Sequence, residues 1–502
     1  DCELSRGLGD VYKRQSVSVN IKERRDYSCA IFNSDGVLVA NAPHVPVHLG
    51  AMGHTVRHMM DTYPEMYSGD CYLSNDPFSG GSHLPDVTAV TPVFCDQKKE
   101  GKPDFFIASR AHHAEIGGIS PGSMPPHATC LAEEGVLIQD FPLVRNGIQK
   151  RVELRQLLSS GEYPSRCPDE NIADIDAQRA AGLFGVKSLQ ELSAIYTKMR
   201  LHSIMDQLLE VSGNTVEHWI RTLPEEPLEF KDCLDDGTAI GVTLKREAGG
   251  LTIEFETGPA HPNGFNATPA IVTAAVLYVI RCLAGSELPL CEGALRDVNI
   301  IIPAGLLDPP HHTDPRQCAA VVAGNVETSQ RVTDVLLGAL QAAAASQGTM
   351  NNFLLGNDQF GYYETIAGGS GATSHGNGAD GVHTHMTNTR ITDPEILESR
   401  LPVRLVQFAI RSGSGGGGAY RGGNGVIREF EFLESLVLSL ITSRRTTQPY
   451  GMENGLPGAA GQNHLIHRNG KAEMLDFRVS RTVMPGDRLV IETPGGGGWG
   501  SS

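Results

Sequence analysis

The sequence predicts an α+β protein of several subdomains whose sheets are mostly antiparallel. Helical periodicity is concentrated near residues 168–222, whereas short strand-like segments and turns fill 64–130 and most of the chain after 223. The 502 residues exceed the size at which a single hydrophobic core stops growing, which predicts two or three subdomains. No internal repeat is visible.

The first half begins with strands and a helix. The segments with strand character, in chain order, are 16–21, 27–32, the V-L-V-A after the turn at Ser34-Asp35-Gly36, 86–94 and 104–109. Met52, Val56 and Met59 recur at helical spacing and predict a helix within 48–63. The turns of 64–130 carry His, Asp and Glu, and long loops of this kind inside a compact protein are more often functional than decorative.

The second half begins with the clearest helices. Pro168 and the acids after it suit a helix N-terminus, and a second amphipathic segment reaches Thr222. After a boundary at L-P-E-E-P, the sequence predicts strands at A-I-G-V-T-L-K and G-L-T-I-E-F-E-T, helices over 268–284 and 332–346, and further strands after 400. The glycine runs at 415–418 and 495–498 are interpreted as a flexible turn and a tail near a subunit contact.

Three regions are distinguished along the chain. Residues 1–15 do not lead naturally into the strand-like segment at 16–21, and their V-Y-K-R-Q resembles translated adapter sequence, so we expect a non-native leader on a chain that began further upstream. Residues 16–222 are expected to carry a metal site, and 223–502 to form the C-terminal part of the same unit.

Composition excludes several classes of partner. The formal net charge of −17 repels phosphate backbones and argues against nucleic acid. Ten cysteines without C-x-x-C spacing are typical of free thiols in a reducing compartment. The longest apolar run, 270–280, is too short to span a bilayer, and nothing resembles a signal peptide. We therefore expect a cytoplasmic protein without a membrane partner.

One loop suggests a metal site. S-N-D-P-F-S-G-G-S-H-L-P-D at 74–86 contains His83 and Asp86, and S-R-A-H-H-A-E-I-G-G at 109–118 supplies His112 and His113. Imidazole and carboxylate are ligands that suit Zn²⁺, Mn²⁺ or Fe²⁺. Neighbouring strand residues face opposite ways, so only one of the two adjacent histidines points inward. Glu23 is a candidate fourth ligand; a solvated, turn-rich loop is the alternative.

Three further clusters are candidate binding sites. His44 and His48, between prolines, suit a rigid loop or a pocket wall. G-N-V-E-T-S-Q-R at 324–331 either caps a helix or binds an anion through Arg331. V-H-T-H-M-T-N-T-R, expected as a strand, offers donors for a carboxylate or cyclic amide, and a structural network would look the same. Its candidate substrate-binding residues are His383, His385, Asn388 and Arg390.

Taken together and in order, these motifs resemble the hydantoinase B/oxoprolinase family, from about residue 16 to 500. The matching segments are K-E-R-R-D-Y-S-C-A-I-F, H-V-P-V-H-L-G-A-M, S-N-D-P-F-S-G-G-S-H-L-P-D, S-R-A-H-H-A-E-I-G-G, G-N-V-E-T-S-Q-R, V-H-T-H-M-T-N-T-R and P-G-G-G-G-W-G. The family includes the C-terminal half of ATP-dependent 5-oxoprolinase, the N-methylhydantoinase B subunit, and subunits of acetone and acetophenone carboxylases. The oxoprolinase branch is the most similar.

The resemblance implies a division of labour within a hetero-oligomer. A hydantoinase A-like ATPase subunit or domain phosphorylates the substrate, and this chain, which has no Walker loop, holds a divalent metal and completes the chemistry. Carried over by motif, the metal ligands would be Glu23, His83, Asp86 and His112 or His113.

The implied reaction is ATP-dependent hydrolysis of a five-membered cyclic amide, of the 5-oxoproline or hydantoin type. Asp76 or Glu115 is then the expected general base, and Arg390 or Arg331 the group that holds a substrate carboxylate. The alternatives are a subunit of an ATP-dependent ketone carboxylase and a non-catalytic scaffold for the ATPase.

Overall fold

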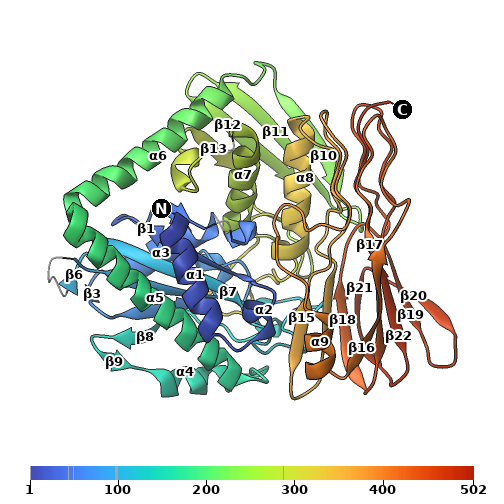
Figure 1. Cartoon of the computed structure of the whole chain (residues 1–502), viewed down its shortest axis with the longest axis horizontal. Coiled ribbons are helices and arrows are strands. Elements are labelled where there is room, and N and C mark those ends of the chain that lie inside the picture. Colours follow the sequence, from blue (N-terminus) through green and yellow to red (C-terminus); the bar gives the residue numbers. More distant parts are fainter. Residues whose placement is uncertain (1, 43, 49, 96–99, 286–287, 502) are drawn as a thin grey trace.

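The computed structural model describes residues 2–42, 44–48, 50–95, 100–285 and 288–501, and it has the predicted α+β architecture (Figure 1). Its largest sheet has seven strands in the order β2-β1-β7-β5-β4-β8-β9, and every neighbouring pair is antiparallel. These strands are β1 (Tyr27–Phe32), β2 (Leu38–Asn41), β4 (Cys71–Ser74), β5 (Asp86–Val93), β7 (Phe105–His112), β8 (Phe141–Arg145) and β9 (Ile148–Gln149).

Helices cover both faces of this sheet. Alternation along β1 sends Cys29 and Ile31 into one core, and Ala30 and Phe32 into the core on the opposite face. The first core includes residues of α1 (Cys2–Gln15), α5 (Pro168–Tyr196) and α6 (Lys198–Ile220), and the second includes residues of α3 (Ala51–Thr62). Helix α4 (Arg151–Leu158) packs against α5 (Figure 1).

A second layer joins a four-stranded sheet to two apolar helices. Its order is β10-β11-β12-β13, and the one parallel pair among these described strands is β12–β13. The elements are β10 (Leu228–Cys233), β11 (Ala239–Glu247), β12 (Gly250–Thr257), β13 (Val298–Ile301), α7 (Pro269–Ala284) and α8 (Ser329–Ala339). Their buried side chains form one large hydrophobic core between the sheet and the two helices.

The C-terminal part is a pair of sheets that share a core of Phe, Leu, Ile and Val (Figure 1). One sheet, in the order β15-β14-β18-β21, consists of β14 (Asn352–Gly356), β15 (Gly361–Glu364), β18 (Leu436–Ile441) and β21 (Arg478–Val483). The other, in the order β16-β17-β22-β19-β20, consists of β16 (Val403–Ile410), β17 (Val426–Phe432), β19 (Gln462–Ile466), β20 (Ala472–Leu475) and β22 (Arg488–Glu492).

Short elements complete the described chain. They are α2 (Val19–Lys22), α9 (Pro394–Arg400), the small pair β3 (Met66–Tyr67) and β6 (Glu100–Gly101), the 3₁₀ turns η1 (Pro46–His48), η2 (Pro77–Ser79), η3 (Leu131–Glu133) and η4 (Glu292–Leu295), and a π-helical turn η5 (Gly324–Thr328). No helix in these ranges is long and apolar enough to cross a membrane.

The glycine run at 495–498 is buried, the run at 415–418 is mostly half-buried, and both are hydrogen-bonded, where the sequence had suggested a flexible turn and a tail. The Gly416 N–H donates to the Gly496 carbonyl at 2.8 Å, and the Gly497 N–H donates to Ala345 at the same distance. The chains approach so closely that a Cβ on Gly496 would lie 1.9 Å from the carbonyl oxygen of Ser370. Only glycine permits this backbone contact.

Most of the predicted elements are confirmed: the strands at 27–32, 86–94 and 104–109, the helix within 48–63, the pair of helices over 168–222, and the helix over 268–284. Three predictions are wrong. Residues 19–22 of the expected first strand form α2, the helix expected over 332–346 ends at Ala339, and 378–390 is irregular chain in which His385 has a φ of 55°.

The N-terminal segment is helical. Residues 2–15 form α1, and its Leu8 and Tyr12 are fully buried in the core against α5. Its origin as a non-native leader, and the division at residues 222 and 223, stay predictions.

Candidate metal centre

Two strand ends and a turn meet at one end of the large sheet. Strand β5 begins at Asp86, strand β7 ends at His112, and these two residues are direct cross-strand partners. A turn brings His83 back over Asp86, whose N–H donates to the His83 carbonyl at 3.0 Å. The turn and the antiparallel register therefore bring His83 and His112 together, although they lie 29 residues apart in the sequence.

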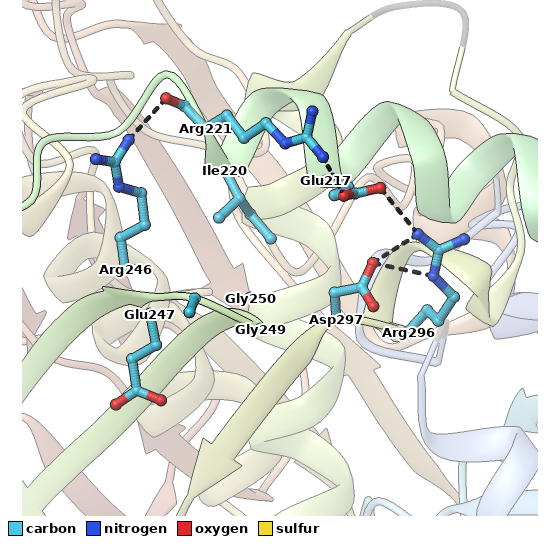
Figure 2. Close-up of a pocket in the computed structure, with 10 residues that line it drawn as sticks. Glu217, Ile220, Arg221, Arg246, Glu247, Gly249, Gly250, Arg296 and Asp297 are labelled. Atoms are coloured by element: carbon cyan, nitrogen blue, oxygen red, sulfur yellow. Dashed lines mark hydrogen bonds and ion pairs between the residues drawn. The ribbon is translucent and has the colours of Figure 1, made fainter.

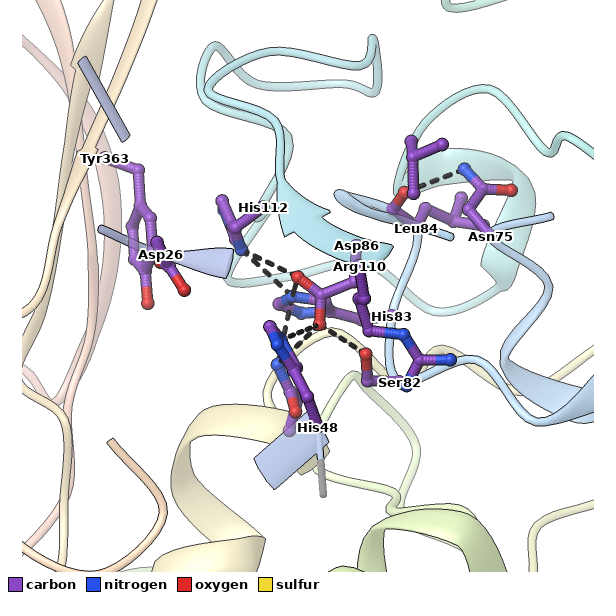
Figure 3. Close-up of polar contacts among 12 residues, drawn as sticks. Asp26, His48, Asn75, Ser82, His83, Leu84, Asp86, Arg110, His112 and Tyr363 are labelled. Carbon is purple, nitrogen blue, oxygen red and sulfur yellow. Dashed lines mark hydrogen bonds and ion pairs between the residues drawn. The ribbon is translucent and has the colours of Figure 1, made fainter. Parts of the chain in front are cut away.

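The donor atoms of these side chains form a tight triangle (Figure 3). His83 Nε2 and His112 Nδ1 lie 3.2 and 3.3 Å from Asp86 Oδ1, and 3.2 Å from each other. All three side chains are buried, and theirs is the one group of at least three His, Cys, Asp or Glu ligand atoms that converges in this way among the described residues.

The protonation states suit a cation. Burial lowers the pKa of His112 although Asp86 opposes it, which keeps the ring neutral with a free lone pair. Burial by itself would raise the pKa of Asp86, but the contacts of its carboxylate with His83, His48 and His112 hold that pKa well below its usual range. The carboxylate is therefore ionised.

A hydrogen bond to a backbone carbonyl fixes the orientation of the His83 ring. Its Nδ1 lies 3.1 Å from the Val322 carbonyl, which can only accept, so the proton sits on Nδ1 and the Nε2 lone pair faces the triangle. Asp86 Oδ1 is buried and has no hydrogen-bond donor among the described residues. Two imidazole nitrogens and an unpaired carboxylate oxygen around one point fit a divalent cation.

Three polar side chains surround Asp86 Oδ2. The first is Ser82, whose hydroxyl group hydrogen-bonds it (Figure 3). His48, from η1, places Nε2 3.3 Å away, and its Nδ1 lies 3.0 Å from Ser28 Oγ. Asn325, from the π-helical turn η5, reaches His83 Nε2 at 3.0 Å and Asp86 Oδ2 at 3.4 Å. The sequence had suggested a pocket-wall role for His48 and had not singled out Asn325.

A second carboxylate lies on the other side of His112. Asp26 immediately precedes β1, and its carbonyl accepts the His112 N–H at 3.1 Å (Figure 3). Its carboxylate is buried, 3.8 Å from Arg24. The ring of Tyr363 stacks on His112 with centroids 4.4 Å apart. Asp26 was not predicted, although it directly precedes the strand that pairs with β7.

Two predicted ligands lie outside the triangle. His113 faces the other way: its Nδ1 lies 3.1 Å from the Asn171 amide of α5, and burial lowers its pKa to about 4. Glu23 is the half-buried C-terminal cap of α2 and is not part of the convergent group. The structure thus brings together His83, Asp86 and His112.

The carboxylates of the two predicted general bases accept hydrogen bonds from loop residues around them. Asp76 accepts hydrogen bonds from Phe78 N at 3.0 Å and Ser79 Oγ at 2.8 Å, as the cap of η2. Glu115 accepts from Gly122 N at 2.9 Å and from Arg166 at 3.1 Å. Burial raises the pKa of Glu115 against the effect of Arg166.

The five predicted substrate-binding residues occupy different environments. Arg331 and His385 belong to a buried ionic network, in which Arg331 Nε lies 3.5 Å from Asp232 and His385 Nε2 lies 3.3 Å from Asp334.

The other three lie closer to residues 24–48. His383 is half-buried, and this burial lowers its pKa to about 4, with Arg24 adding to the effect. The Asn388 amide donates to the His44 carbonyl at 3.1 Å, and Asn388 and Arg390 line a surface cavity of about 360 Å³.

The fold and the buried cluster define an α+β protein with a candidate metal centre, and comparisons with known proteins extend this description. Residues 4–502 match the family model for hydantoinase B/oxoprolinase. The chain is 43% identical to 5-oxoprolinase 1 of Arabidopsis thaliana, over 99% of this chain and 41% of that protein. It spans about two fifths of the length of the first curated relatives that it matches.

Two solved structures share the fold. The ATP-dependent caprolactamase of Pseudomonas jessenii has a TM-score of 0.88 at 23% identity, with 99% of this chain and 89% of that chain covered. Nucleotide-free acetone carboxylase has a TM-score of 0.86 at 16% identity, with 99% and 74% covered. The chain belongs to the hydantoinase B/oxoprolinase family.

Proposed function

We propose that this chain is the ring-opening part of an ATP-dependent cyclic amidohydrolase. It acts on a five-membered cyclic amide of the 5-oxoproline or hydantoin type, together with a hydantoinase A-like ATPase subunit or domain. The observation that carries the proposal is the buried His83–Asp86–His112 triangle, in a chain that resembles 5-oxoprolinases over nearly its whole length. The ATPase is proposed to bind ATP and to activate the amide oxygen, and the assembly to be cytoplasmic.

In this proposal His83, Asp86 and His112 hold a divalent cation (Zn²⁺, Mn²⁺ or Fe²⁺), and Asp26 lies beside them. A bound cation would polarise a carbonyl or phosphoryl oxygen and lower the pKa of water. The protein contributes orientation: the Val322 carbonyl fixes the His83 tautomer, and the Tyr363 ring fixes the plane of His112.

His48 is proposed as the acid–base group near the metal centre because of its contacts. His48 Nε2 faces Asp86 Oδ2 at 3.3 Å, and Ser28 Oγ supports the other ring nitrogen, so His48 is a better placed acid–base group than Asp76 or Glu115. The carboxylates of Asp76 and Glu115 are instead proposed to shape the loops that surround the centre.

A ketone carboxylase subunit is the second candidate, favoured by the fold shared with acetone carboxylase. A non-catalytic scaffold is the third, and it would have no use for a buried triangle of two imidazole nitrogens and a carboxylate oxygen. The carboxylase would form a carboxylated ketone and the scaffold would form no product, so product analysis distinguishes both from the amidohydrolase.

The test combines the purified chain with a hydantoinase A-like ATPase subunit. Ring-opened product and ADP are measured with 5-oxoproline and with hydantoin, and acetone with bicarbonate serves as the carboxylase arm. We expect ring opening that needs both proteins and ATP and that the Asp86→Ala variant lacks. Carboxylated acetone, or ATP hydrolysis without any ring opening in the presence of this chain, would overturn the proposal.

A further inference from the structure

The metal centre lies where three parts of the fold meet. The large sheet supplies Asp86 and His112. The π-helical turn η5, which precedes α8, supplies Asn325, and β15 of the C-terminal sheets supplies Tyr363, which lies beside His112 (Figure 3). The groups around the centre therefore keep their places only if η5 and β15 are themselves held in place relative to each other.

Glu327 connects these two elements. It lies in the same turn as Asn325 and is fully buried. Its Oε1 accepts the Met350 N–H at 3.0 Å and the Asn352 side-chain amide at 2.7 Å, and its Oε2 accepts the Ser443 hydroxyl. Asn352 begins β14 and Ser443 follows the end of β18, so this one carboxylate ties η5 to two neighbouring strands of the C-terminal sheet.

Asn352 extends this connection to the metal centre. Its Nδ2 donates to Glu327 and to the Ile441 carbonyl, each at 2.7 Å. Its Oδ1 therefore faces the other way, where it accepts the Tyr363 hydroxyl at 2.8 Å. The Tyr363 ring stacks on His112 with centroids 4.4 Å apart. A continuous chain of contacts thus runs from Glu327 to a proposed metal ligand.

A second connection runs along η5 itself. Isolated π-helical turns are frequent at functional sites. The Glu327 N–H donates to the Ala323 carbonyl at 2.7 Å, while its side chain bonds outside the turn, so both its backbone and its carboxylate fix η5. Asn325, two residues earlier, reaches His83 Nε2 at 3.0 Å and Asp86 Oδ2 at 3.4 Å. The place of the Asn325 amide therefore depends on how Glu327 is anchored.

The donors around Glu327 indicate that its role is geometric. At the surface, carboxylates pair with cations: in the cavity of about 510 Å³ shown in Figure 2, Asp297 lies 2.6 Å from Arg296. Such exposed ion pairs contribute little to stability. The hydrogen-bond donors of Glu327 are instead neutral N–H and O–H groups from two separate stretches of chain, and a buried group of this kind fixes the relative position of its partners.

We propose that Glu327 is a positioning residue for the metal centre. Through Asn352 it holds the Tyr363 ring against His112, and through η5 it holds the Asn325 amide beside the triangle. The inference rests on the proposed function, whose metal site is the triangle, and it adds a residue that acts through other side chains and not by contact with the cation.

Cobalt(II), whose visible absorption spectrum depends on its coordination geometry, tests this role on the full-length chain. Affinity, from chelator competition, and the spectrum are measured for the wild type, Glu327→Ala and Glu327→Gln. The matched control is Asp174→Ala, because Asp174 is also fully buried and accepts the Val17 N–H at 2.8 Å. Glu327→Ala should lose about tenfold or more in affinity and change the spectrum. Glu327→Gln keeps an oxygen acceptor for the Met350 N–H and the Asn352 amide, and should match the wild type, as should the control.

Two further measurements serve if Glu327→Ala fails to fold or the wild type binds no metal. Tyr363→Phe keeps the ring but removes the hydroxyl that bonds Asn352, so its cobalt spectrum should also change. In metal-free protein with ¹³C-labelled histidine, the His112 signal is identified by its absence from His112→Ala. This signal should move in Glu327→Ala and in Tyr363→Phe, and should stay in place in Glu327→Gln.

Each outcome decides the question. Wild-type affinity and spectrum in Glu327→Ala, or equal changes in Glu327→Ala and Asp174→Ala, would overturn the inference. If Glu327→Ala does not fold, an unchanged spectrum in Tyr363→Phe would overturn it. A wild type that binds neither cobalt(II) nor zinc would refute the metal site of the proposed function. The His112 signal then decides the inference separately: movement in the variants supports it, and a signal that stays in place overturns it.

Discussion

Glu134 offers a sensitive test of how the metal centre is held. It is fully buried, and its Oε1 accepts the N–H groups of Val321 and Val322 at 2.7 and 2.8 Å. The Val322 carbonyl in turn fixes the Nδ1 of His83 at 3.1 Å. Glu134 therefore positions a proposed ligand through one intervening residue.

Replacing Glu134 by alanine would leave two buried N–H groups without an acceptor. Each costs about 1–3 kcal/mol, so the variant should lose about 2–6 kcal/mol of stability. Because His83 would lose its support, metal affinity should fall about 10–100-fold. Glu134→Gln keeps a carbonyl oxygen for both N–H groups and should hold metal like the wild type.

The pH dependence has the same cause. Burial raises the pKa of Glu134 from 4.5 to about 8, against the two hydrogen bonds from Val322 and Val321. Because the folded pKa lies above the unfolded one, the folded state prefers the protonated acid. The stability that protonated Glu134 contributes is fully present below pH 4.5 and is lost as the pH rises to about 8, by about 5 kcal/mol in all. Glu134→Gln has no carboxyl group to ionise. Its free energy of unfolding should therefore exceed that of the wild type by more and more as the pH rises through this window.

Chemical unfolding at about pH 5 and about pH 8, near the two ends of this window, measures the effect on stability, and competition with a chelator measures the effect on metal affinity. Glu134→Ala should unfold at lower denaturant and release metal more readily than Glu134→Gln. If Glu134→Ala matched the wild type in both assays, the positioning role would be refuted. A gain of Glu134→Gln that did not grow with pH would refute the raised pKa of Glu134.

Further predictions concern the glycine runs, the ionic network and the second carboxylate. Gly496→Ala should lower the unfolding temperature markedly, because its Cβ would lie 1.9 Å from a carbonyl oxygen, while Gly376→Ala, with no atom within 4 Å, should leave it unchanged in a thermal melt. Arg331→Met should destabilise the fold by about 1.5–3 kcal/mol in chemical unfolding, because Asp232 loses one of its two arginine partners and keeps Arg444 at 2.6 Å, and should leave 5-oxoproline affinity unchanged in titration. Asp26→Asn should weaken metal binding in chelator competition, whereas Glu23→Gln should not; the reverse order would restore Glu23 as a ligand.

The fold was predictable where local pattern and tertiary structure agree. The helices over 168–222 carry their own start signals and apolar spacing, and β5 and β7 are continuous buried strands. Residues 16–21 alternate like a strand, but Val17 N donates to Asp174 of α5 at 2.8 Å, and this distant contact guides the chain into α2. Such contacts are invisible in a local window.

The candidate site was predictable as a set of residue types and not as a geometry. His83 and Asp86 stand out in one loop, but choosing His112 over His113 requires the register of β5 against β7. Asn325 was missed although it lies in the G-N-V-E-T-S-Q-R motif, because that motif was interpreted as a helix cap or an anion site and only the tertiary structure brings its π-helical turn beside His83.

The most informative prediction concerns His83, Asp86 and His112, which are proposed to hold a divalent metal. The most direct measurement is elemental analysis by plasma mass spectrometry of the full-length protein, after incubation with zinc, manganese or iron(II), beside the neighbouring variants His112→Ala and His113→Ala. We expect close to one metal per chain in the wild type and in His113→Ala, and its loss in His112→Ala. A metal-free wild type, or metal retained equally in both variants, would contradict it.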